Sequence, residues 1–211
     1  MPKVKFVIFD DFHPDPDSVR EMALGLEYPA TGRYPGRNSQ NVEPEEWLAV
    51  VSELLNMAIR PKAGHNDIAL FRRSEPQEWS GSDIHFDRTD WAGVCYLTPQ
   101  DSLRGGTVFF RHIESGLDHW PDLDERAAMV DRGLIECSDL SDERAFQLYF
   151  AKDCWDRSKW QQVFAIPYRY NRAAFYDASQ FHTIDGLDTF GTERHARLTQ
   201  IFFFDVNREI Q

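Results

Sequence analysis

The sequence predicts a mainly β protein in which N-terminal α-helices brace a sandwich or barrel of strands. Two segments with helical spacing lie within residues 1–60, and short strand-like runs separated by turns recur after Pro61. An apolar content of 42% in 211 residues is enough to build one hydrophobic core. We therefore expect a single domain over residues 1–211, with helical support in 1–60 and a barrel in 61–211.

The N-terminal part begins with a β-branched and aromatic run, Lys5–Phe9, which predicts the first strand. A helix is expected next, because Asp15 can cap it, Pro16 suits its first position and Asp17 favours its dipole. The residue types of Pro29–Asn41 are typical of a loop.

A second helix is expected to open at Glu43 and Pro44. Its apolar stripe consists of Trp47, Val50, Val51, Leu54 and Leu55. The strands of the barrel are then predicted at Asp67–Arg72, Asp83–Phe86, Ala92–Leu97, Thr107–Phe110, Gln162–Tyr168, Ala173–Tyr176 and Ala196–Asp205. Residues 111–161 form a charged insertion, predicted to be helical near Arg144–Ala151 and to cover a pocket.

Composition limits the classes of partner. The net charge of −12 disfavours binding to phosphate backbones, so no nucleic-acid partner is expected. The three cysteines (Cys95, Cys137 and Cys154) are widely spaced and predict neither a disulfide framework nor a zinc ribbon, which favours a cytoplasmic location. The four apolar residues before Asp10 are too few for a signal peptide, and no run predicts a membrane span; the oligomeric state stays open.

Three residues are candidate metal ligands. His85 and Asp87 are two positions apart on a predicted strand, so their side chains project to the same face. His182 follows a distant strand, which a barrel can bring beside the first one. Two imidazoles and one carboxylate on one side of an ion leave open positions, the arrangement typical of non-haem Fe(II) oxygenases. For an isolated His-x-Asp pair, a surface or capping role is the competing interpretation.

Five motifs in order extend this pattern over about residues 81–205. They are His85-Phe86-Asp87, Ala92–Leu97 ending in Tyr-Leu, Gly105-Gly106-Thr107-Val108-Phe109-Phe110, Asn171–Tyr176 leading to His182, and Arg197-Leu198-Thr199. In this combination the sequence resembles the Fe(II)/2-oxoglutarate dioxygenase superfamily, in particular its prolyl-hydroxylase-like branch. The N-terminal Tyr34-Pro35-Gly36-Arg37 resembles an uncharacterised bacterial subgroup.

The resemblance implies a double-stranded β-helix, or jelly-roll barrel, with His85, Asp87 and His182 as catalytic iron ligands. It also implies that 2-oxoglutarate and O2 are co-substrates and that succinate and CO2 are released. Hydroxylation of a small molecule, an amino acid or a peptide is the expected reaction. Desaturation and cyclisation start from the same hydrogen abstraction, so the sequence does not separate them from hydroxylation.

The last strand provides a candidate anchor for 2-oxoglutarate. Alternation places Arg197 and Thr199 on one face of an otherwise apolar strand, where a buried guanidinium requires an anionic partner. Its planar fork suits the distal carboxylate of a dicarboxylic acid. Thr199 and the Tyr96 hydroxyl are expected to bind the remaining carboxylate oxygen. Arg194 is the competing anchor, although its surroundings predict a loop.

Other residues have weaker patterns. His195 shares strand parity with Arg197 and is a possible substrate contact, and His112 is placed near the pocket mouth. The remaining histidines, His13, His65 and His119, are expected to be solvated. Trp91 and Arg37 are further candidate substrate contacts, expected on loops near the barrel mouth.

Two other classes of protein were weighed against the oxygenase. The sequence contains neither a Gly-x-Ser-x-Gly elbow nor a His-Glu-x-x-His helix, which disfavours serine and zinc hydrolases. A non-catalytic or non-redox metal-binding jelly roll, similar to a cupin, is the alternative, because the same fold can hold a different metal or none.

Overall fold

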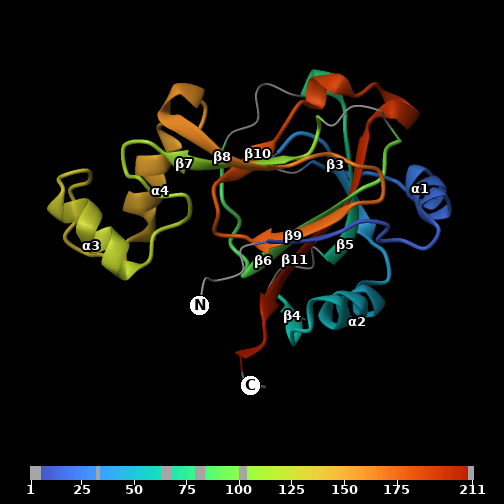
Figure 1. Cartoon of the computed structure of the whole chain (residues 1–211), viewed down its shortest axis with the longest axis horizontal. Helices are drawn as coiled ribbons and strands as arrows, with labels where there is room; N and C mark the ends of the chain where they lie inside the picture. The colour runs from blue at the N-terminus through green and yellow to red at the C-terminus, as the bar shows by residue number, and fades with distance from the viewer. Residues whose placement is uncertain (1–5, 32–33, 63–67, 79–83, 100–103, 209–211) are drawn as a thin grey trace.

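Two antiparallel sheets form facing layers in a computed structural model, which describes residues 6–31, 34–62, 68–78, 84–99 and 104–208 (Figure 1). The strands of the main sheet are β1 (Phe6–Phe9), β2 (Ala30–Thr31), β3 (Arg37–Asn41), β4 (Ile59–Pro61), β5 (Ile68–Ser74), β6 (Trp91–Tyr96), β9 (Ala173–Asp177) and β11 (Arg197–Val206). Their order is β1-β9-β6-β11-β5-β3-β2, and β4 pairs with one end of β11.

The smaller sheet has the order β10-β7-β8. Its strands are β7 (Thr107–His112), β8 (Trp160–Ile166) and β10 (His182–Ile184). Strands distant in the sequence therefore lie side by side in both layers, as in a jelly roll. The prediction of a mainly β, double-stranded β-helix fold is confirmed.

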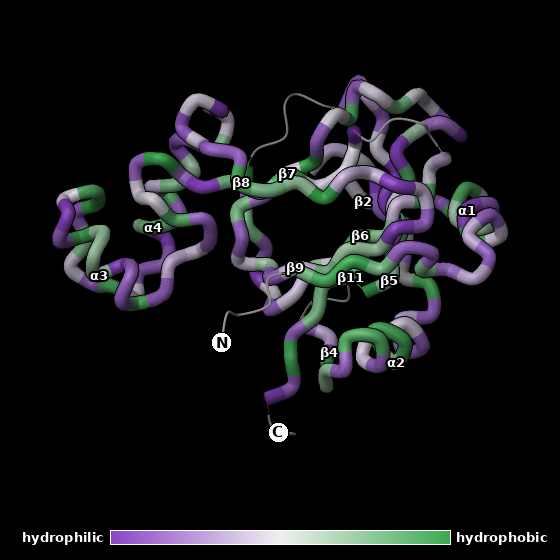
Figure 2. The backbone as a smooth tube through the Cα atoms, viewed as in Figure 1, coloured by the Kyte–Doolittle hydropathy of each residue, from purple (hydrophilic) through white to green (hydrophobic). Residues whose placement is uncertain are grey.

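The two faces of the main sheet pack against different elements. On the outer face, Phe175, Phe202 and Phe204 join a core that includes residues of the helices α1 (Pro16–Leu24) and α2 (Pro44–Leu55). On the inner face, Tyr96 and Ile201 belong to a second core that also includes residues of the small sheet. Figure 2 shows the hydrophobic stretches concentrated along the strands of both layers and along α2. The bracing by N-terminal helices thus occurs on the face opposite the interior of the barrel.

Both N-terminal helices begin where the sequence predicts. The side chain of Asp15 accepts a hydrogen bond from the Ser18 backbone N–H (3.1 Å) and caps α1, and Pro16 is its first residue. Helix α2 begins at Pro44. Lys5, His65, Asp67 and Asp83, which entered the sequence predictions, lie outside the described residues.

The prediction that Pro29–Asn41 is loop throughout was wrong, because β2 and β3 lie within it. β3 (Arg37-Asn-Ser-Gln-Asn) has no hydrophobic alternation, so its strand character depends on pairing with β5. The Ser39 hydroxyl reinforces this pairing by accepting from the Phe71 N–H (2.9 Å). The first 60 residues therefore supply strands of the main sheet as well as helical support.

The insertion between β7 and β8 contains two helices, α3 (Leu123–Asp131) and α4 (Glu143–Ala151). Helix α4 matches the predicted helical segment, whereas α3 was not predicted. In α3, Asp122 and Glu125 form a capping box, a pattern that the sequence already contains. None of the helices that the structure describes is long and apolar enough to cross a membrane.

Candidate metal centre

The backbone brings the three predicted metal ligands together. The predicted strand around His85 forms only a single bridge, in which His85 and His182 exchange both backbone hydrogen bonds (3.0 and 2.8 Å). The N–H of Asp87 donates to the carbonyl oxygen of Ala178 (2.8 Å). These bonds hold the His-x-Asp segment against the start of β10, so residues almost a hundred positions apart share one site.

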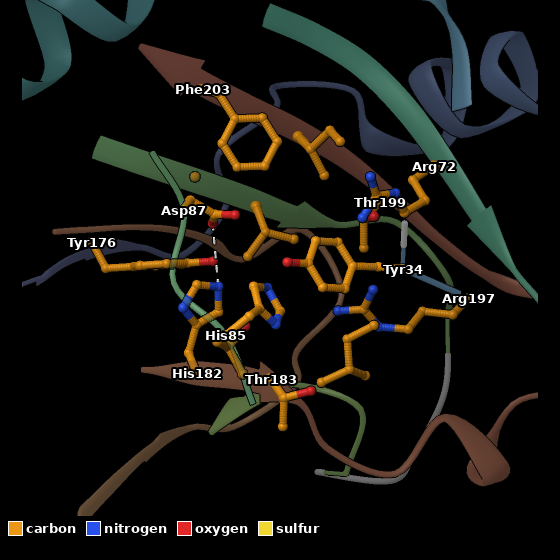
Figure 3. Close-up of a pocket in the computed structure, with 15 residues that line it drawn as sticks. Tyr34, Arg72, His85, Asp87, Tyr176, His182, Thr183, Arg197, Thr199 and Phe203 are labelled. Carbon is orange, nitrogen blue, oxygen red and sulfur yellow. Dashed lines mark ion pairs between the residues drawn. The ribbon is translucent and has the colours of Figure 1, made fainter. Parts of the chain in front are cut away.

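The side chains of His85, Asp87 and His182 form a compact donor set. One ligand atom from each lies within 4.8 Å of the other two. His182 Nε2 is 3.3 Å from Asp87 Oδ2, the pair marked by the dashed line in Figure 3. His182 Nδ1 is 2.8 Å from the carbonyl oxygen of Gln180. A carbonyl can only accept, so Nδ1 donates to it, and Nε2 is the ring nitrogen that faces Asp87.

The charge state of Asp87 also suits a metal ligand. Burial raises the pKa of this carboxyl, but the hydrogen bond with His182 and the positive charges of His182, His85 and Arg72 outweigh that effect. Its pKa is consequently lowered from the ordinary value, and the carboxylate is ionised at neutral pH. Two imidazoles and an ionised carboxylate are donors that divalent transition metals accept.

The donor set lines a cavity of about 70 Å³. Arg197 and Thr199 of β11 line it as well, together with Thr183 of β10. The hydroxyl oxygens of Thr199 and Thr183 are buried and have no hydrogen-bond partner among the described residues. A buried hydroxyl without a partner costs about 1–3 kcal/mol, so these atoms indicate a place for a polar ligand.

Arg197 is a buried cation in this cavity, with 3% of its surface exposed. Its Nε donates to the carbonyl oxygen of Gly105 (3.0 Å), and its guanidinium carbon lies 5.5 Å from the centre of the Tyr96 ring. Burial lowers the pKa of Arg197, but an arginine remains protonated in a protein. Within the described part of the chain no carboxylate pairs with it. A buried charge without a counterion favours binding of an anion.

The other two residues considered for co-substrate binding lie elsewhere. The Tyr96 hydroxyl is 3.0 Å from Thr107 Oγ1, and Tyr96 supports Arg197 through its ring rather than lining the cavity. Arg194 is exposed in a short 3₁₀ turn, Glu193–His195, and pairs with Glu21 at the surface. Of the two candidate anchors, only Arg197 reaches the cavity that the donor set lines.

Tyr34, Tyr176 and Arg72 are cavity residues that the sequence analysis does not single out. The Tyr34 ring stacks on His85 (centroids 3.8 Å apart), and the Tyr176 ring packs edge-on against His182 (4.9 Å). Arg72 of β5 is the register partner of Thr199 and also lines the cavity. Strand parity on β9 was the available signal for Tyr176, whereas the sequence contained no local signal for Tyr34 or Arg72.

Several secondary expectations were wrong. Trp91 is buried in β6 and packs in the core on the outer face of the main sheet, so it is no loop contact for a substrate. His13 is buried against Phe12 and Trp47, and its burial lowers its pKa to about 4. His195 belongs to the exposed 3₁₀ turn instead of the strand of Arg197.

The remaining predicted contacts lie away from the cavity. Arg37 is exposed on β3 and does not line the cavity. His119 is half-buried and pairs with Asp118 and Glu125. His112 is buried at the end of β7, where it forms a second group of possible ligands with Glu114 and Asp153 of the insertion.

The fold and the donor set together define a double-stranded β-helix protein with a candidate metal centre inside the barrel. Residues 2–204 match the model of a family of unknown function (DUF6445), and the chain belongs to that family. None of the curated protein sequences matches it.

Solved structures of similar architecture include a non-haem α-ketoglutarate-dependent carbocyclase, SnoK, from nogalamycin biosynthesis. The two chains are 15% identical with a TM-score of 0.52, and the match covers 96% of this chain and 80% of SnoK. HygX from Streptomyces hygroscopicus, solved with nickel and 2-oxoglutarate, is 17% identical (TM-score 0.45; 95% and 82% covered). A prolyl-4-hydroxylase from Pseudomonas putida is 12% identical (TM-score 0.45; 96% and 92% covered). The likeness to SnoK shows that this chain has the fold of a 2-oxoglutarate-dependent enzyme.

Proposed function

We propose that this protein is a non-haem Fe(II)- and 2-oxoglutarate-dependent oxygenase that hydroxylates a small molecule, an amino acid or a peptide. The observation that carries the proposal is the buried guanidinium of Arg197, which pairs with no described carboxylate, in the same cavity as His85, Asp87 and His182. One wall offers ligands for a divalent metal and another offers a cation for a carboxylate. A co-substrate that chelates iron at one end and carries a carboxylate at the other would use both walls.

The residues present suit these two groups. His85, Asp87 and His182 would hold Fe(II), since their donor atoms lie within 4.8 Å of one another and Asp87 is ionised. Arg197 would bind the distal carboxylate of 2-oxoglutarate, with the hydroxyls of Thr199 and Thr183 donating to its oxygens. When bound, iron and 2-oxoglutarate supply the activation of O2, and succinate and CO2 leave as co-products.

The protein's own contribution would be positioning and the exclusion of water. The Gln180 carbonyl oxygen fixes the orientation of the His182 ring, and Gly105 fixes that of the Arg197 guanidinium. The apolar side chains of Val94, Ile201 and Phe203 line the same cavity and limit the access of water to it. Only a substrate group that passes these apolar side chains and comes close to the candidate metal ligands would lose a hydrogen atom.

An anaerobic titration of the metal-free protein with Fe(II) and 2-oxoglutarate tests the proposal. We expect a visible metal-to-ligand charge-transfer band that requires both additions, disappears in His182→Ala and weakens in Arg197→Met. Arg194→Met is the matched control, because its guanidinium is exposed and outside the cavity, and it should leave the band unchanged. Binding of iron without any band on addition of 2-oxoglutarate would overturn the proposal and favour a non-redox metal-binding jelly roll.

A further inference from the structure

A second, larger cavity of about 530 Å³ adjoins the candidate metal centre. The two cavities share lining residues, namely Tyr34, Arg72, His85, Asp87 and Phe203. Two of these are candidate metal ligands, so a molecule in the outer cavity would lie directly beside the metal. The far wall is formed by the insertion, through residues of α4 such as Phe150.

Among the described residues, cationic side chains outnumber carboxylates in the lining of the outer cavity, in a protein of net charge −12. Lys62, Arg72 and Arg88 line it, and Asp87 is the one carboxylate among the described residues that do so. Since Asp87 would bind the metal, the charged side chains that the described part of this wall presents to a substrate are these three cations. The rest of the wall includes Ile84, Phe150, Phe181 and Phe203, which are apolar.

The cationic side chains are oriented by neutral groups. Arg72 Nε donates to Asn38 Oδ1 (2.8 Å), Arg88 donates to Gln147 Oε1 (3.0 Å), and Lys62 donates to the backbone carbonyl oxygen of Arg88. These bonds help to hold the three side chains at the wall of the outer cavity. Arg72 differs from the other two because it lines both cavities, and in Figure 3 it enters the inner one from the same side as Arg197.

We propose that the outer cavity binds a small substrate with an anionic group, a carboxylate or a phosphate, attached to an apolar body. Arg72 binds the anionic group through its planar fork, assisted by the charges of Lys62 and Arg88. The apolar body extends toward Phe150 and Phe181. The role of this molecule as substrate rests on the proposed oxygenase function, whereas its binding does not. Because Arg72 borders the metal cavity, the oxidised carbon lies close to the anionic group.

Matched probes test this preference. We would measure the affinities of 3-phenylpropanoate, its amide 3-phenylpropanamide and phenyl phosphate by isothermal titration calorimetry, with the full chain and with 2-oxoglutarate present in excess. At least one anion is expected to bind at least tenfold more tightly than the neutral amide. The carboxylate and phosphate arms show which anionic group the cavity prefers. If the amide binds as tightly as both anions, or if no anion binds, the inference is wrong.

Arg72→Gln should remove most of the preference for the anion, about tenfold, and leave the affinity for the amide unchanged. The matched control is Arg73→Gln on the same strand, because the Arg73 guanidinium lies over the Tyr28 ring (5.3 Å) and does not line either cavity. Equal losses in both variants would overturn the assignment to Arg72. If Arg72→Gln fails to fold, Lys62→Gln and Arg88→Gln still test the cavity, and each should weaken anion binding two- to threefold. Unchanged anion binding in both would contradict the inference.

The iron titration separates this inference from the proposed function. In Arg72→Gln the charge-transfer band with Fe(II) and 2-oxoglutarate should persist. Loss of the band in this variant alone would mean that Arg72 holds 2-oxoglutarate, which overturns the inference and leaves the oxygenase function standing. Absence of the band in the unmodified protein, together with a preference for anions that depends on Arg72, would overturn the oxygenase function and leave the anion site.

Discussion

The protein contains two groups of three histidine and carboxylate side chains in different surroundings. The barrel group is His85, Asp87 and His182, inside the barrel. The insertion group is His112, at the end of β7, together with Glu114 and Asp153 of the insertion. In both, the possible ligand atoms lie within 4.8 Å of one another. The spacing of the ligand atoms therefore does not by itself separate a metal centre from a structural network.

The insertion group already uses its polar atoms. His112 Nδ1 bonds Ser115 Oγ and its Nε2 bonds Asp153 Oδ2, both at 3.1 Å. Glu114 Oε2 accepts from Tyr149 (2.9 Å) and Lys152 (3.2 Å), and this lysine already compensates its charge. A metal would have to break these bonds and would meet an ammonium group, so this group is expected to stabilise the insertion instead.

The barrel group differs in what it faces. His182 Nδ1 donates to a backbone carbonyl oxygen and its Nε2 faces Asp87. The three side chains line a cavity that also contains Arg197 and two hydroxyls without a hydrogen-bond partner among the described residues. His112, by contrast, is fully buried among Tyr149, Phe150 and Trp160. A group of histidine and carboxylate side chains becomes a candidate metal centre where its donor atoms line a cavity. Here that cavity also contains Arg197, a cation that pairs with no described carboxylate.

The largest expected effect is on metal affinity. His182→Ala should weaken binding of Mn(II) at least about 100-fold. It removes a metal ligand itself, whereas losing a residue that only hydrogen-bonds a ligand typically costs about 10- to 100-fold. His112→Ala is the matched control in the insertion and should bind the metal as the unmodified protein does. Isothermal titration calorimetry measures both variants. Loss of metal binding in His112→Ala, with retention in His182→Ala, would reverse the assignment of the two groups.

The next largest effect is expected on the binding of 2-oxoglutarate beside the barrel group. Arg197→Met should weaken binding of 2-oxoglutarate to the Mn(II)-loaded protein by about 2–4 kcal/mol, because it removes a desolvated, charge-assisted contact. Arg194→Met should change the affinity by less than about 0.5 kcal/mol, since Arg194 is exposed. Equal losses in the two variants would show that the anchor is not Arg197.

Replacing the histidine of the insertion group should lower the stability of the folded protein. His112→Phe fills a similar volume but leaves Asp153 and Ser115 without their partner, so the free energy of unfolding should fall by about 2 kcal/mol. Urea denaturation measures this change. His195→Gln, at an exposed position, should stay within about 0.5 kcal/mol of the unmodified protein. An unchanged stability of His112→Phe would contradict a structural role for this group.

The smallest expected effect is a pH dependence of the stability difference between the unmodified protein and His112→Phe. Burial lowers the pKa of His112 despite the opposing effect of Asp153, so the unfolded chain takes up a proton at this residue before the folded protein does. Stability from His112 is therefore present above its ordinary pKa of 6.5 and declines as the pH falls below it. The stability difference between the unmodified protein and His112→Phe should shrink by about 1 kcal/mol or less between pH 7 and pH 5.5. A difference that grows on acidification would contradict a neutral His112.

Local patterns in the sequence predicted much of the fold. The N-cap at Asp15, the helix start at Pro44 and the alternating run that became β11 all depend on neighbouring residues. β3 escaped prediction because its residues are polar and its strand character comes from pairing with β5. Helix α3 was overlooked although the capping box of Asp122 and Glu125 was visible in the sequence.

The residues of the candidate site also fall into two sets: those that local sequence patterns predict and those that only the packing of the fold brings to the cavity. His85 and Asp87 are two residues apart, and strand alternation placed Arg197 and Thr199 on one face, so these positions were accessible to sequence reasoning. Tyr34 and Arg72 reach the cavity through the packing of a loop and the register of β5 against β11. No local periodicity encodes either contact, which explains why both were missed.

The central claim is that the barrel group, and not the insertion group, holds the metal beside a carboxylate bound to Arg197. A crystal structure of the protein with Mn(II) and 2-oxoglutarate, with anomalous data to locate manganese, tests it most directly. We expect an anomalous peak bounded by His85, Asp87 and His182, with the distal carboxylate of 2-oxoglutarate on Arg197. A peak at His112, Glu114 and Asp153, or 2-oxoglutarate bound away from Arg197, would contradict the claim.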